Sequence, residues 1–448
     1  MGALACMLKD LGYEITGSDH AVYPPMSDFL RNKGVIINEG FNEENLNYKP
    51  DLVIVGNAIS SDNSEVAAIL KKSLYYCSMP QALNFLASKN KKQLLITGTH
   101  GKTTTSSLLS YILFKAGLEP SFMIGGILKN FDSNYRIGSG DYIVIEGDEY
   151  DTAFFDKGAK FFHYNPSIAV LGNIEFDHAD IFTDLNHVKN TFKRFADGMD
   201  VNSSLYTFDT DQNIKDVTVD TNCKIVNYGK RTESDWSLGK FYPNPPYNNF
   251  EVYKKGELFS NFETRLTGEH NLLNALSVIA IADSLNIQKD IIKSALKSFE
   301  SVKRRQEIRG VKKGITVMDD FAHHPTAVRE TVKALKPFYS GKIIAVFEPR
   351  TNSSMRDIFQ NIYPSSFDDA DLIFIREPSM IKKVSESERF SSKKLVSDLN
   401  SKGKEAYYYN ETESIMEHIA KIAEKNDLVL IMSNGGFDNI HERLLDIL

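Results

Sequence analysis

One stretch decides the fold of this 448-residue chain: Leu94-Leu-Ile-Thr-Gly98-Thr-His-Gly101-Lys102-Thr103-Thr104-Thr105. An apolar run, typical of a buried strand, passes through two glycines into a helical stretch over 106–116. Gly98 and Gly101 let the backbone curl so that its N–H groups face a phosphate, and the start of the helix adds further donors. The junction predicts a P-loop, although only two residues separate the glycines where the usual pattern has four.

The polar residues of this loop predict its ligand. Lys102 can reach the β- and γ-phosphates of a nucleotide, and the Thr103 hydroxyl can ligate Mg²⁺. The alternative is a plain strand–turn–helix that carries an exposed lysine. We expect ATP and Mg²⁺ to bind here, with contacts from Gly98, Thr99, His100, Gly101, Lys102, Thr103 and Thr104.

Strand-like and helix-like segments alternate along the chain, which predicts an α/β fold with doubly wound parallel sheets. Changes in this pattern near residues 88 and 300 divide the chain into three domains, 1–88, 89–300 and 301–448. Residues 200–265 are rich in Asn, Tyr and Thr, and we interpret them as a β-rich addition to the second domain.

The composition excludes several classes of protein. Hydrophobic residues make up 42% of the chain and charged residues 25%, which is ordinary for a globular protein. The net charge of −7 gives no overall basic field for nucleic acid. No apolar run reaches the length of about 18 residues that a membrane helix needs, and no secretory signal opens the chain. We expect a cytoplasmic protein that binds neither nucleic acid nor membranes and keeps its three cysteines reduced.

Two acidic clusters follow predicted buried strands, over residues 146–151 and 175–178. Open α/β sheets bind ligands at the carboxyl ends of their strands, where both clusters fall. Mg²⁺ prefers oxygen ligands, so one or two of these carboxylates suffice to hold it. A solvated acidic loop is the alternative for each cluster.

Further candidates lie later in the chain. Asn271 and Asn274 share one face of a predicted helix and suit a base edge or a phosphate-linked water, with helix capping by Asn271 as the alternative. Arg305, at the second domain boundary, suits a forked phosphate clamp. The stretch 317–325 ends a strand with two carboxylates and two imidazoles: Asp319, Asp320, His323 and His324. A zinc site there is a weak alternative, because no further Cys or His supplies its other ligands.

These motifs stand in the order seen in the Mur ligases, which make the amide bonds of peptidoglycan precursors. The chain resembles that family over essentially its whole length. The resemblance implies a Rossmann-like UDP-sugar domain, a central P-loop ATPase-like domain with a parallel sheet, and a Rossmann-like C-terminal domain for the amine substrate. The residues that carry it are the loop 97–105, Glu146, Asp177, His178, His270, Asn271, Asn274, Arg305, Asp319, Asp320, His323, His324 and Pro325.

The resemblance also implies roles for single residues. Lys102 would hold the β- and γ-phosphates, and Thr103 and Glu146 would hold one Mg²⁺. His178 would serve a second metal. Asn271 and Asn274 would lie near the adenine, Arg305 would contact phosphate, and Asp320 would contact the ribose of ATP. His323 and His324 would shape the junction where the amine arrives, and Arg350 would bind a carboxylate of the peptide. The expected catalytic set is Lys102, His178, Arg305, His323 and His324.

Within the family, the segments 22–27, 147–156, 175–180 and 348–350 resemble the murein peptide ligase branch. That branch joins UDP-N-acetylmuramate to the recycled tripeptide L-Ala-γ-D-Glu-meso-diaminopimelate through an acyl phosphate. The L-alanine ligase branch is the alternative, although it usually has Asp-Glu-Ser-Asp where this chain has Asp-Glu-Tyr-Asp at 148–151. A nucleotide switch that hydrolyses ATP without ligation is a second alternative.

The first domain of the family begins with a strand and a Gly-x-Gly-Gly turn, and residues 1–7 of this chain resemble the helix that follows them. We therefore expect the first domain to lack that strand and turn, so that ATP still binds while UDP-sugar affinity is lower and ligation is poor. The remaining candidates for contacts with the UDP-sugar are Asp19, Ser60 and Ser61. For the two serines, a purely structural turn is the alternative.

Overall fold

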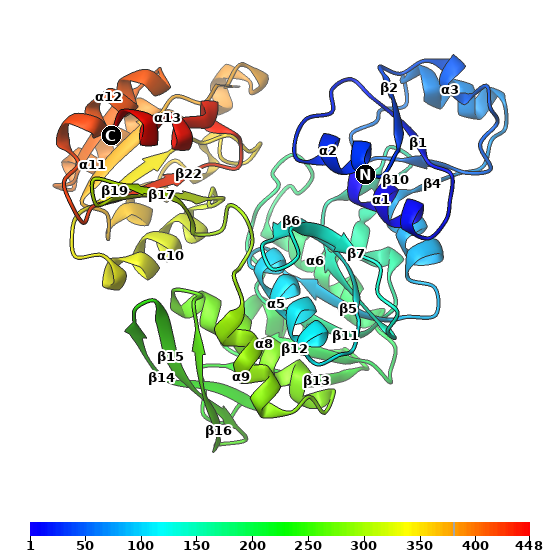
Figure 1. Ribbon diagram of the computed structural model, residues 1–448, viewed down its shortest axis with the longest axis horizontal. Coiled ribbons are helices and arrows are strands. Elements are labelled where there is room, and N and C mark those ends of the chain that lie inside the picture. The colour runs from blue at the N-terminus through cyan, green and yellow to red at the C-terminus, as the bar shows by residue number, and fades with distance from the viewer. Residues whose placement is uncertain (380) are drawn as a thin grey trace.

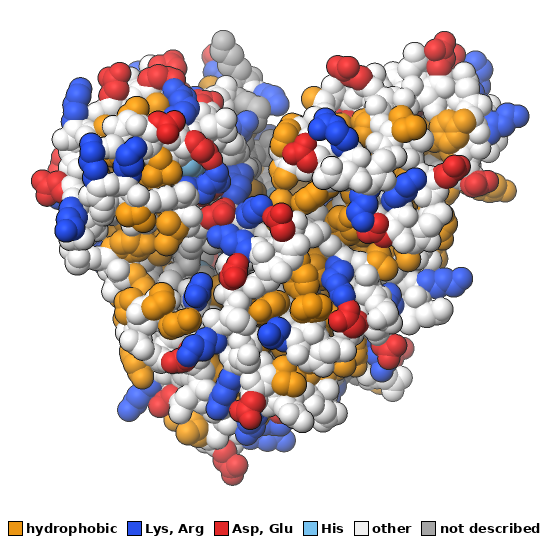
Figure 2. All heavy atoms as spheres, in the orientation of Figure 1, with side chains coloured by type: hydrophobic (Ala, Val, Ile, Leu, Met, Phe, Trp, Pro, Cys, Tyr) orange, Lys and Arg blue, Asp and Glu red, His pale blue; other side chains and the backbone are white. Residues whose placement is uncertain are grey.

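Residues 1–379 and 381–448 are described by a computed structural model in which three α/β units meet around a common centre (Figure 1). The N-terminal unit (blue) occupies the upper right and the C-terminal unit (yellow to red) the upper left, above the middle unit (cyan to green). On the face shown in Figure 2, a notch separates the two upper units, and Lys and Arg side chains are interspersed with Asp and Glu.

The N-terminal unit contains four short strands in two separate parallel pairs, β1 with β2 and β3 with β4. The sequence predicts one doubly wound sheet here. The parallel pairing is confirmed, but strands of three or four residues form few ladder bonds and join only in pairs. The elements are α1 (Gly2–Asp10), β1 (Thr16–Asp19), α2 (Met26–Asn32), β2 (Ile36–Glu39), β3 (Val53–Val55), α3 (Ser64–Lys71), β4 (Tyr76–Ser78) and α4 (Met79–Ala82).

The middle unit is built on a ten-stranded sheet with the order β16-β15-β14-β13-β12-β11-β5-β8-β6-β7. Its strands are β5 (Lys92–Thr97), β6 (Ser121–Leu128), β7 (Ser133–Arg136), β8 (Tyr142–Gly147), β11 (Pro166–Leu171), β12 (Ser204–Phe208), β13 (Lys224–Gly229), β14 (Trp236–Asn244), β15 (Tyr247–Lys254) and β16 (Glu257–Thr264). A separate antiparallel pair is formed by β9 (Asp151–Ala153) and β10 (Asp156–Ala159). The β-rich stretch after residue 200 is therefore no separate addition: β12 and β13 extend the parallel sheet, and β14, β15 and β16 continue it as an antiparallel ribbon.

Helices cover both faces of this sheet. One face packs against α5 (Lys102–Lys115), α8 (Glu269–Ser284) and α9 (Lys289–Ser298). The other face packs against α6 (Leu185–Asp197), α7 (Gln212–Thr218) and the α1 helix of the N-terminal unit. Because α1 buries Leu4, Cys6 and Met7 in this shared core, the N-terminal unit is fixed to the middle unit by apolar contact.

The C-terminal unit has a six-stranded sheet with the order β17-β18-β22-β19-β20-β21, in which only β17 is antiparallel to its neighbour. Buried clusters lie on both faces, as expected for a doubly wound sheet. The elements are β17 (Glu307–Lys312), β18 (Ile315–Asp320), α10 (Pro325–Leu335), β19 (Ile343–Phe347), β20 (Leu372–Arg376), α11 (Ser392–Ser401), β21 (Glu405–Tyr409), α12 (Thr412–Ile422), β22 (Leu428–Met432) and α13 (Ile440–Ile447).

Three neighbouring strands of the middle sheet end at one edge. In the parallel ladders, Thr97 at the end of β5 pairs with Gly147 of β8 on one side and with Leu171 of β11 on the other. The P-loop and both acidic clusters therefore leave the sheet side by side, as the sequence predicts. No helix among the described residues is long and apolar enough to span a membrane.

Candidate functional site

The P-loop takes a conformation that needs its glycines. Gly98 and Gly101 have φ values of +123° and +81°, where residues with a side chain are strained. A Cβ at Gly98 would lie 3.0 Å from the backbone N of Asn173, and one at Gly101 would lie 2.9 Å from the side-chain oxygen of Asn274. Both positions are thus closed to larger residues by backbone angle and by close neighbours.

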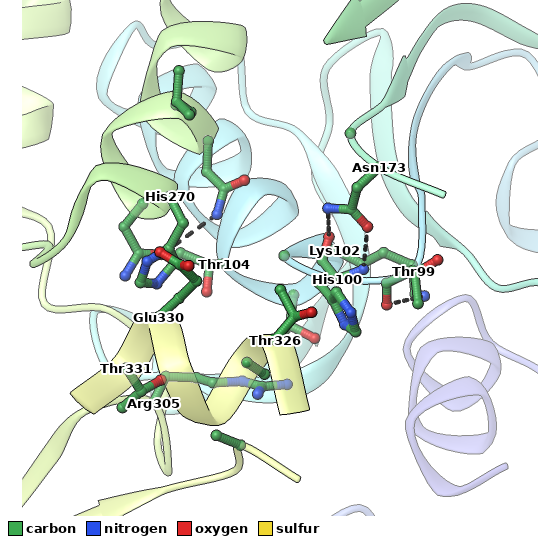
Figure 3. A pocket seen from close by; sticks show the side chains of 18 of the residues that line it. Thr99, His100, Lys102, Thr104, Asn173, His270, Arg305, Thr326, Glu330 and Thr331 are labelled. Carbon is green, nitrogen blue, oxygen red and sulfur yellow. Dashed lines mark hydrogen bonds between the residues drawn. The ribbon is translucent and has the colours of Figure 1, made fainter. Parts of the chain in front are cut away.

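Asn173, just past β11, holds the P-loop in place. Its side-chain oxygen accepts the His100 N–H at 2.7 Å, and its amide donates to the His100 carbonyl at 3.2 Å. Its own carbonyl accepts the Thr99 N–H at 3.1 Å. Figure 3 shows Asn173 bonded to the loop in this way. No role was predicted for Asn173, although its place directly after a buried strand is the signal that could have identified it.

Lys102 is buried and already paired. Its Nζ donates to the carbonyls of Gly98 and Thr99 at 2.7 and 3.2 Å, and to Oε2 of Glu149 at 2.9 Å. Burial lowers the pKa of Lys102, but Glu149 and Asp148 raise it more, so the side chain is charged at neutral pH. A cation held at the mouth of a P-loop by one carboxylate is placed to exchange that carboxylate for a phosphate.

Thr103 and Glu146 lie together at the base of the loop. The Thr103 hydroxyl donates to Oε2 of Glu146 at 3.3 Å, and the other oxygen of Glu146 accepts the Gly125 N–H at 2.8 Å. Burial raises the pKa of Glu146 above its ordinary value. Both predicted Mg²⁺ ligands are thus brought to one place.

His178 lies on the other side of Glu149, with its Nε2 3.5 Å from Oε1 of that carboxylate. Its φ of +54° is unusual for a residue with a side chain, and such strain gathers at functional sites. Burial lowers the pKa of His178, but Glu149 and Asp177 raise it more. Glu149, which the sequence named only as part of an acidic cluster, therefore links Lys102 to His178.

A cavity of about 330 Å³ lies between the P-loop and the C-terminal unit. Figure 3 shows its labelled residues entering from both sides, with Thr99, His100, Lys102, Thr104 and Asn173 from the middle unit and Arg305, Thr326, Glu330 and Thr331 from the C-terminal unit. Most predicted nucleotide contacts line it: Thr99, His100, Gly101, Lys102, Thr103, Thr104, Asn271, Asn274, Arg305 and Asp320. His323 also lines it, whereas Gly98 does not.

The first turn of α8 faces this cavity. Asn271 donates to the Thr267 carbonyl at 2.8 Å and accepts from Asn274 at 3.4 Å. The helix is capped by Gly268, so the alternative that Asn271 is the cap is wrong. Since Asn274 also touches Gly101, the two amides connect α8 to the P-loop.

Two neighbouring arginines at the hinge have different surroundings. Arg304 donates to the carbonyls of Ser433 and Gly435 at 2.7 and 2.6 Å and is tied into the C-terminal unit. Arg305 lines the cavity over the Phe321 ring at 4.6 Å, and burial lowers its pKa. Asp320 accepts the backbone N–H groups of residues 306 and 322 at 2.8 Å, so it fixes the hinge as well as lining the cavity.

The two histidines after β18 meet the middle unit. His323 lies 3.9 Å from Asp177, and burial lowers its pKa. His324 caps α10, accepting the Thr326 N–H at 3.3 Å, and its other ring nitrogen lies 3.2 Å from the Phe176 carbonyl. The predicted junction residues thus lie at a domain contact.

His100, Glu175 and His324 form the one group in the described chain whose metal-ligating atoms all lie within 4.8 Å of one another. A further histidine is thus available near His324, contrary to the prediction from the sequence, because the fold brings His100 from the P-loop. Both ring nitrogens of His324 are nevertheless engaged by backbone groups, and Glu175 accepts the Thr326 hydroxyl at 2.7 Å. Nε2 of His100 lies 3.5 Å from the Glu175 carboxylate and has no hydrogen-bond partner among the described residues, so the group brings the P-loop against α10.

Known protein families match the chain in three successive segments that correspond to the three units. The Mur ligase family catalytic domain matches residues 1–91, the Mur ligase middle domain 96–282, and the Mur ligase glutamate ligase domain 304–435. The UDP-N-acetylmuramate–L-alanyl-gamma-D-glutamyl-meso-2,6-diaminoheptandioate ligase of Escherichia coli is 38% identical, over 100% of this chain and 95% of that protein. The chain belongs to the Mur ligase family. It is therefore an ATP-dependent ligase that forms amide bonds, as the sequence predicts.

Two further relatives bear on this Mur ligase. The UDP-N-acetylmuramate–L-alanine ligase of Clostridium tetani is 33% identical, over 97% of this chain and 93% of that protein. The crystal structure of a murein peptide ligase from Psychrobacter arcticus has a TM-score of 0.72 and 31% identity, over 100% of this chain and 96% of that one. The predicted three-domain α/β fold is thus confirmed.

Four predicted substrate residues of the Mur ligase lie outside the nucleotide cavity. Asp19 and Ser60 are exposed, and their nearest bonds are local, to the Ala21 N–H and to Asp62 respectively. Ser61 is also exposed. Arg350 is half-buried at the end of β19, 3.8 Å from Glu348, and packs against Gly435. The roles of these four residues stay predictions.

We expect His324 to make the stability of the enzyme depend on pH. Burial lowers the pKa of His324 to about 4, from an ordinary value of 6.5. The folded state then binds fewer protons than the unfolded state between these values, so stability is lost as the pH falls from 6.5 towards 4. The loss of folding free energy attributable to protonation of His324 is on the order of 3 kcal/mol.

The test is the thermal midpoint at pH 7.5 and at pH 4.5. The variant His324→Asn keeps a capping oxygen for α10 and should show a smaller drop between the two conditions than the native enzyme. His187→Asn, on the exposed surface of α6, serves as control and should leave the drop unchanged. Equal drops in the native enzyme and His324→Asn would contradict this account.

Proposed function

We propose that this Mur ligase joins UDP-N-acetylmuramate to the tripeptide L-Ala-γ-D-Glu-meso-diaminopimelate. The full-length identity of 38% to the Escherichia coli ligase, whose name specifies this peptide, supports the proposal over the 33% to L-alanine ligases. A role in peptidoglycan synthesis and recycling in the cytoplasm follows from these substrates. Ligation of free L-alanine is the second candidate, favoured by the Clostridium tetani match.

The observation that carries the ATP-dependent part of the proposal is the cavity shared by the P-loop and the C-terminal unit. It gathers Lys102, Arg305 and the amides of α8 around one space. We assign the phosphates of ATP to Lys102 and Arg305, and its adenine side to Asn271 and Asn274. On this assignment the functional domains are 1–88, 89–300 and 301–448.

A Mg²⁺ ion suits the oxygens of Thr103 and Glu146. A hydroxyl and a carboxylate 3.3 Å apart are hard donors of the kind that Mg²⁺ prefers, and these two residues would hold it. When bound, the ion neutralises charge on the phosphates. We assign a second metal to His178.

The chemistry follows from the groups around the phosphates. The sugar carboxylate attacks the γ-phosphorus of ATP, ADP leaves, and the resulting acyl phosphate reacts with the peptide amine to form the amide and release phosphate. Lys102 and Arg305 stabilise negative charge as it moves between oxygens. Because an acyl phosphate hydrolyses readily, the contact of His323 and His324 with the middle unit serves to exclude water.

The test compares amine substrates at fixed ATP and UDP-N-acetylmuramate, measuring ADP release and the mass of the product. We expect turnover with the tripeptide to exceed turnover with L-alanine at equal concentration. Preference for L-alanine would favour the second candidate. ADP release that ignores both the sugar and the amine would favour a plain ATPase.

A further inference from the structure

A second cavity, of about 340 Å³, lies between the middle and C-terminal units. We call it the outer cavity. Its middle-unit wall is Phe176 with residues 179–183, and its C-terminal wall is residues 356–358 with Glu388. None of these residues lines the nucleotide cavity, so the outer cavity is a separate space.

One wall of the outer cavity lies in the stretch of chain that directly follows His178. The N–H groups of Ile181 and Phe182 both donate to the His178 carbonyl, at 2.9 and 3.0 Å, so this wall folds back on His178. The two walls meet where Asn352 donates to Asp180 at 3.0 Å and Ser353 accepts the Ala179 N–H at 3.2 Å. The stretch that carries His178 therefore continues directly into the wall of the outer cavity.

The same contact connects Arg350 with the outer cavity. Residues 351–356 form a turn, closed by bonds from the Met355 N–H to the Thr351 carbonyl at 3.0 Å and from the Arg356 N–H to the Ser353 carbonyl at 3.1 Å. Arg350 stands just before this turn, and Arg356 stands at its end in the wall of the outer cavity. An arginine thus stands at each end of the turn, and only Arg356 lines the outer cavity.

Charges of both signs line the outer cavity. Arg356 donates through Nη1 to Glu388 at 2.6 Å, while its Nε is buried and has no hydrogen-bond partner among the residues described. Asp180 and Asp357 add two carboxylates. The aromatic rings of Phe176 and Phe182 lie among them and offer apolar surface. A guanidinium beside carboxylates suits a ligand that carries a carboxylate and an ammonium on one carbon, at the end of a methylene chain.

We propose that the outer cavity binds the far end of the peptide substrate, the zwitterionic head of its third, diamino acid residue. The inference rests on the proposed function, because it takes the peptide as substrate. Three extended residues span roughly 10 Å, so a peptide whose amine reacts near His178 can reach beyond the residues that follow it in the chain. Arg356 would bind the terminal carboxylate, and Asp357 would face the terminal ammonium.

The test measures kcat/KM for three amine substrates: the tripeptide ending in meso-diaminopimelate, the tripeptide ending in L-lysine, and the dipeptide L-Ala-γ-D-Glu. The lysine peptide keeps its α-carboxylate and the ammonium at the far end of the side chain. It lacks only the second carboxylate of diaminopimelate, on the carbon that bears that ammonium. We expect Arg356→Gln to lower kcat/KM for the diaminopimelate peptide about 10- to 100-fold, the loss of one charge-assisted hydrogen bond. The loss should be smaller for the lysine peptide and smallest for the dipeptide.

A second variant and a control complete the design. Asp357→Asn should lower kcat/KM for both tripeptides, which share the ammonium, more than for the dipeptide. Arg443→Gln changes a half-buried arginine of α13 that does not line the outer cavity, and it should change none of the three values. An unchanged ratio of diaminopimelate to lysine peptide in Arg356→Gln would overturn the inference. A native enzyme that turns over neither tripeptide would instead overturn the proposed function.

Discussion

Lys102→Met stops ADP release, lowering the rate by about a thousandfold or more, because the phosphoryl group loses the cation that stabilises its charge. Lys102 Nζ is held 2.7 Å from the Gly98 carbonyl at the mouth of the P-loop, so no other side chain can take its place without moving the loop. The measurement is ADP release at saturating substrates, together with ATP affinity by calorimetry. We expect the affinity for ATP to fall by a smaller factor than the rate of ADP release.

Removing Lys102 also leaves the buried Glu149 without its lysine partner and with only His178 beside it, which lowers the free energy of unfolding by about 3 kcal/mol. The double variant Lys102→Met with Glu149→Gln removes that unpaired charge and should regain thermal stability while remaining inactive. Lys115→Met, at the exposed end of the same helix, is the matched control and should be fully active. Native rates of ADP release in a folded Lys102→Met enzyme would exclude this P-loop assignment.

Glu146→Gln has the second largest expected effect, a loss of about a hundredfold or more in ADP release with a higher Mg²⁺ requirement. The amide still accepts the Gly125 N–H that the carboxylate accepts at 2.8 Å. Burial already raises the pKa of Glu146, so a neutral side chain costs the fold little. The measurement is the rate of ADP release across a titration of Mg²⁺.

Asp141→Asn is the matched control, since Asp141 is an exposed carboxylate just before β8 and Glu146 lies near the other end of that strand. We expect the Asp141 variant to keep the native Mg²⁺ dependence and the native melting temperature. If both variants respond to Mg²⁺ as the native enzyme does, the ion is not held at Glu146.

Local pattern was enough to predict the parts of the site that lie within one strand–loop–helix. The apolar run before Gly98 gives a buried strand, and the glycines give the loop. The rule that parallel strands share an edge then brings Glu146 and His178 to Lys102. These predictions depend on short-range periodicity and on one general property of open sheets.

Contacts between distant segments could not be predicted in this way. Asn173 and the P-loop are far apart in the sequence, and the bond between them depends on the register of β5 against β11. The resemblance picks out Arg305 over Arg304 at the hinge, but the physical reason lies in a distant segment: the Ser433 carbonyl accepts from Arg304, and Arg305 is left to line the cavity. His324 is similar, because only the packing of α10 on the middle unit shows that its imidazole is engaged on both nitrogens.

The central claim is ligation through an acyl phosphate, and oxygen transfer tests it most directly. UDP-N-acetylmuramate labelled with ¹⁸O in its carboxylate is incubated with ATP, Mg²⁺ and the tripeptide, and the released phosphate is analysed by mass spectrometry. We predict one ¹⁸O in each phosphate released per amide formed, since the carboxylate oxygen that attacks phosphorus leaves with it. Unlabelled phosphate, released at the same rate with or without tripeptide, would contradict the account.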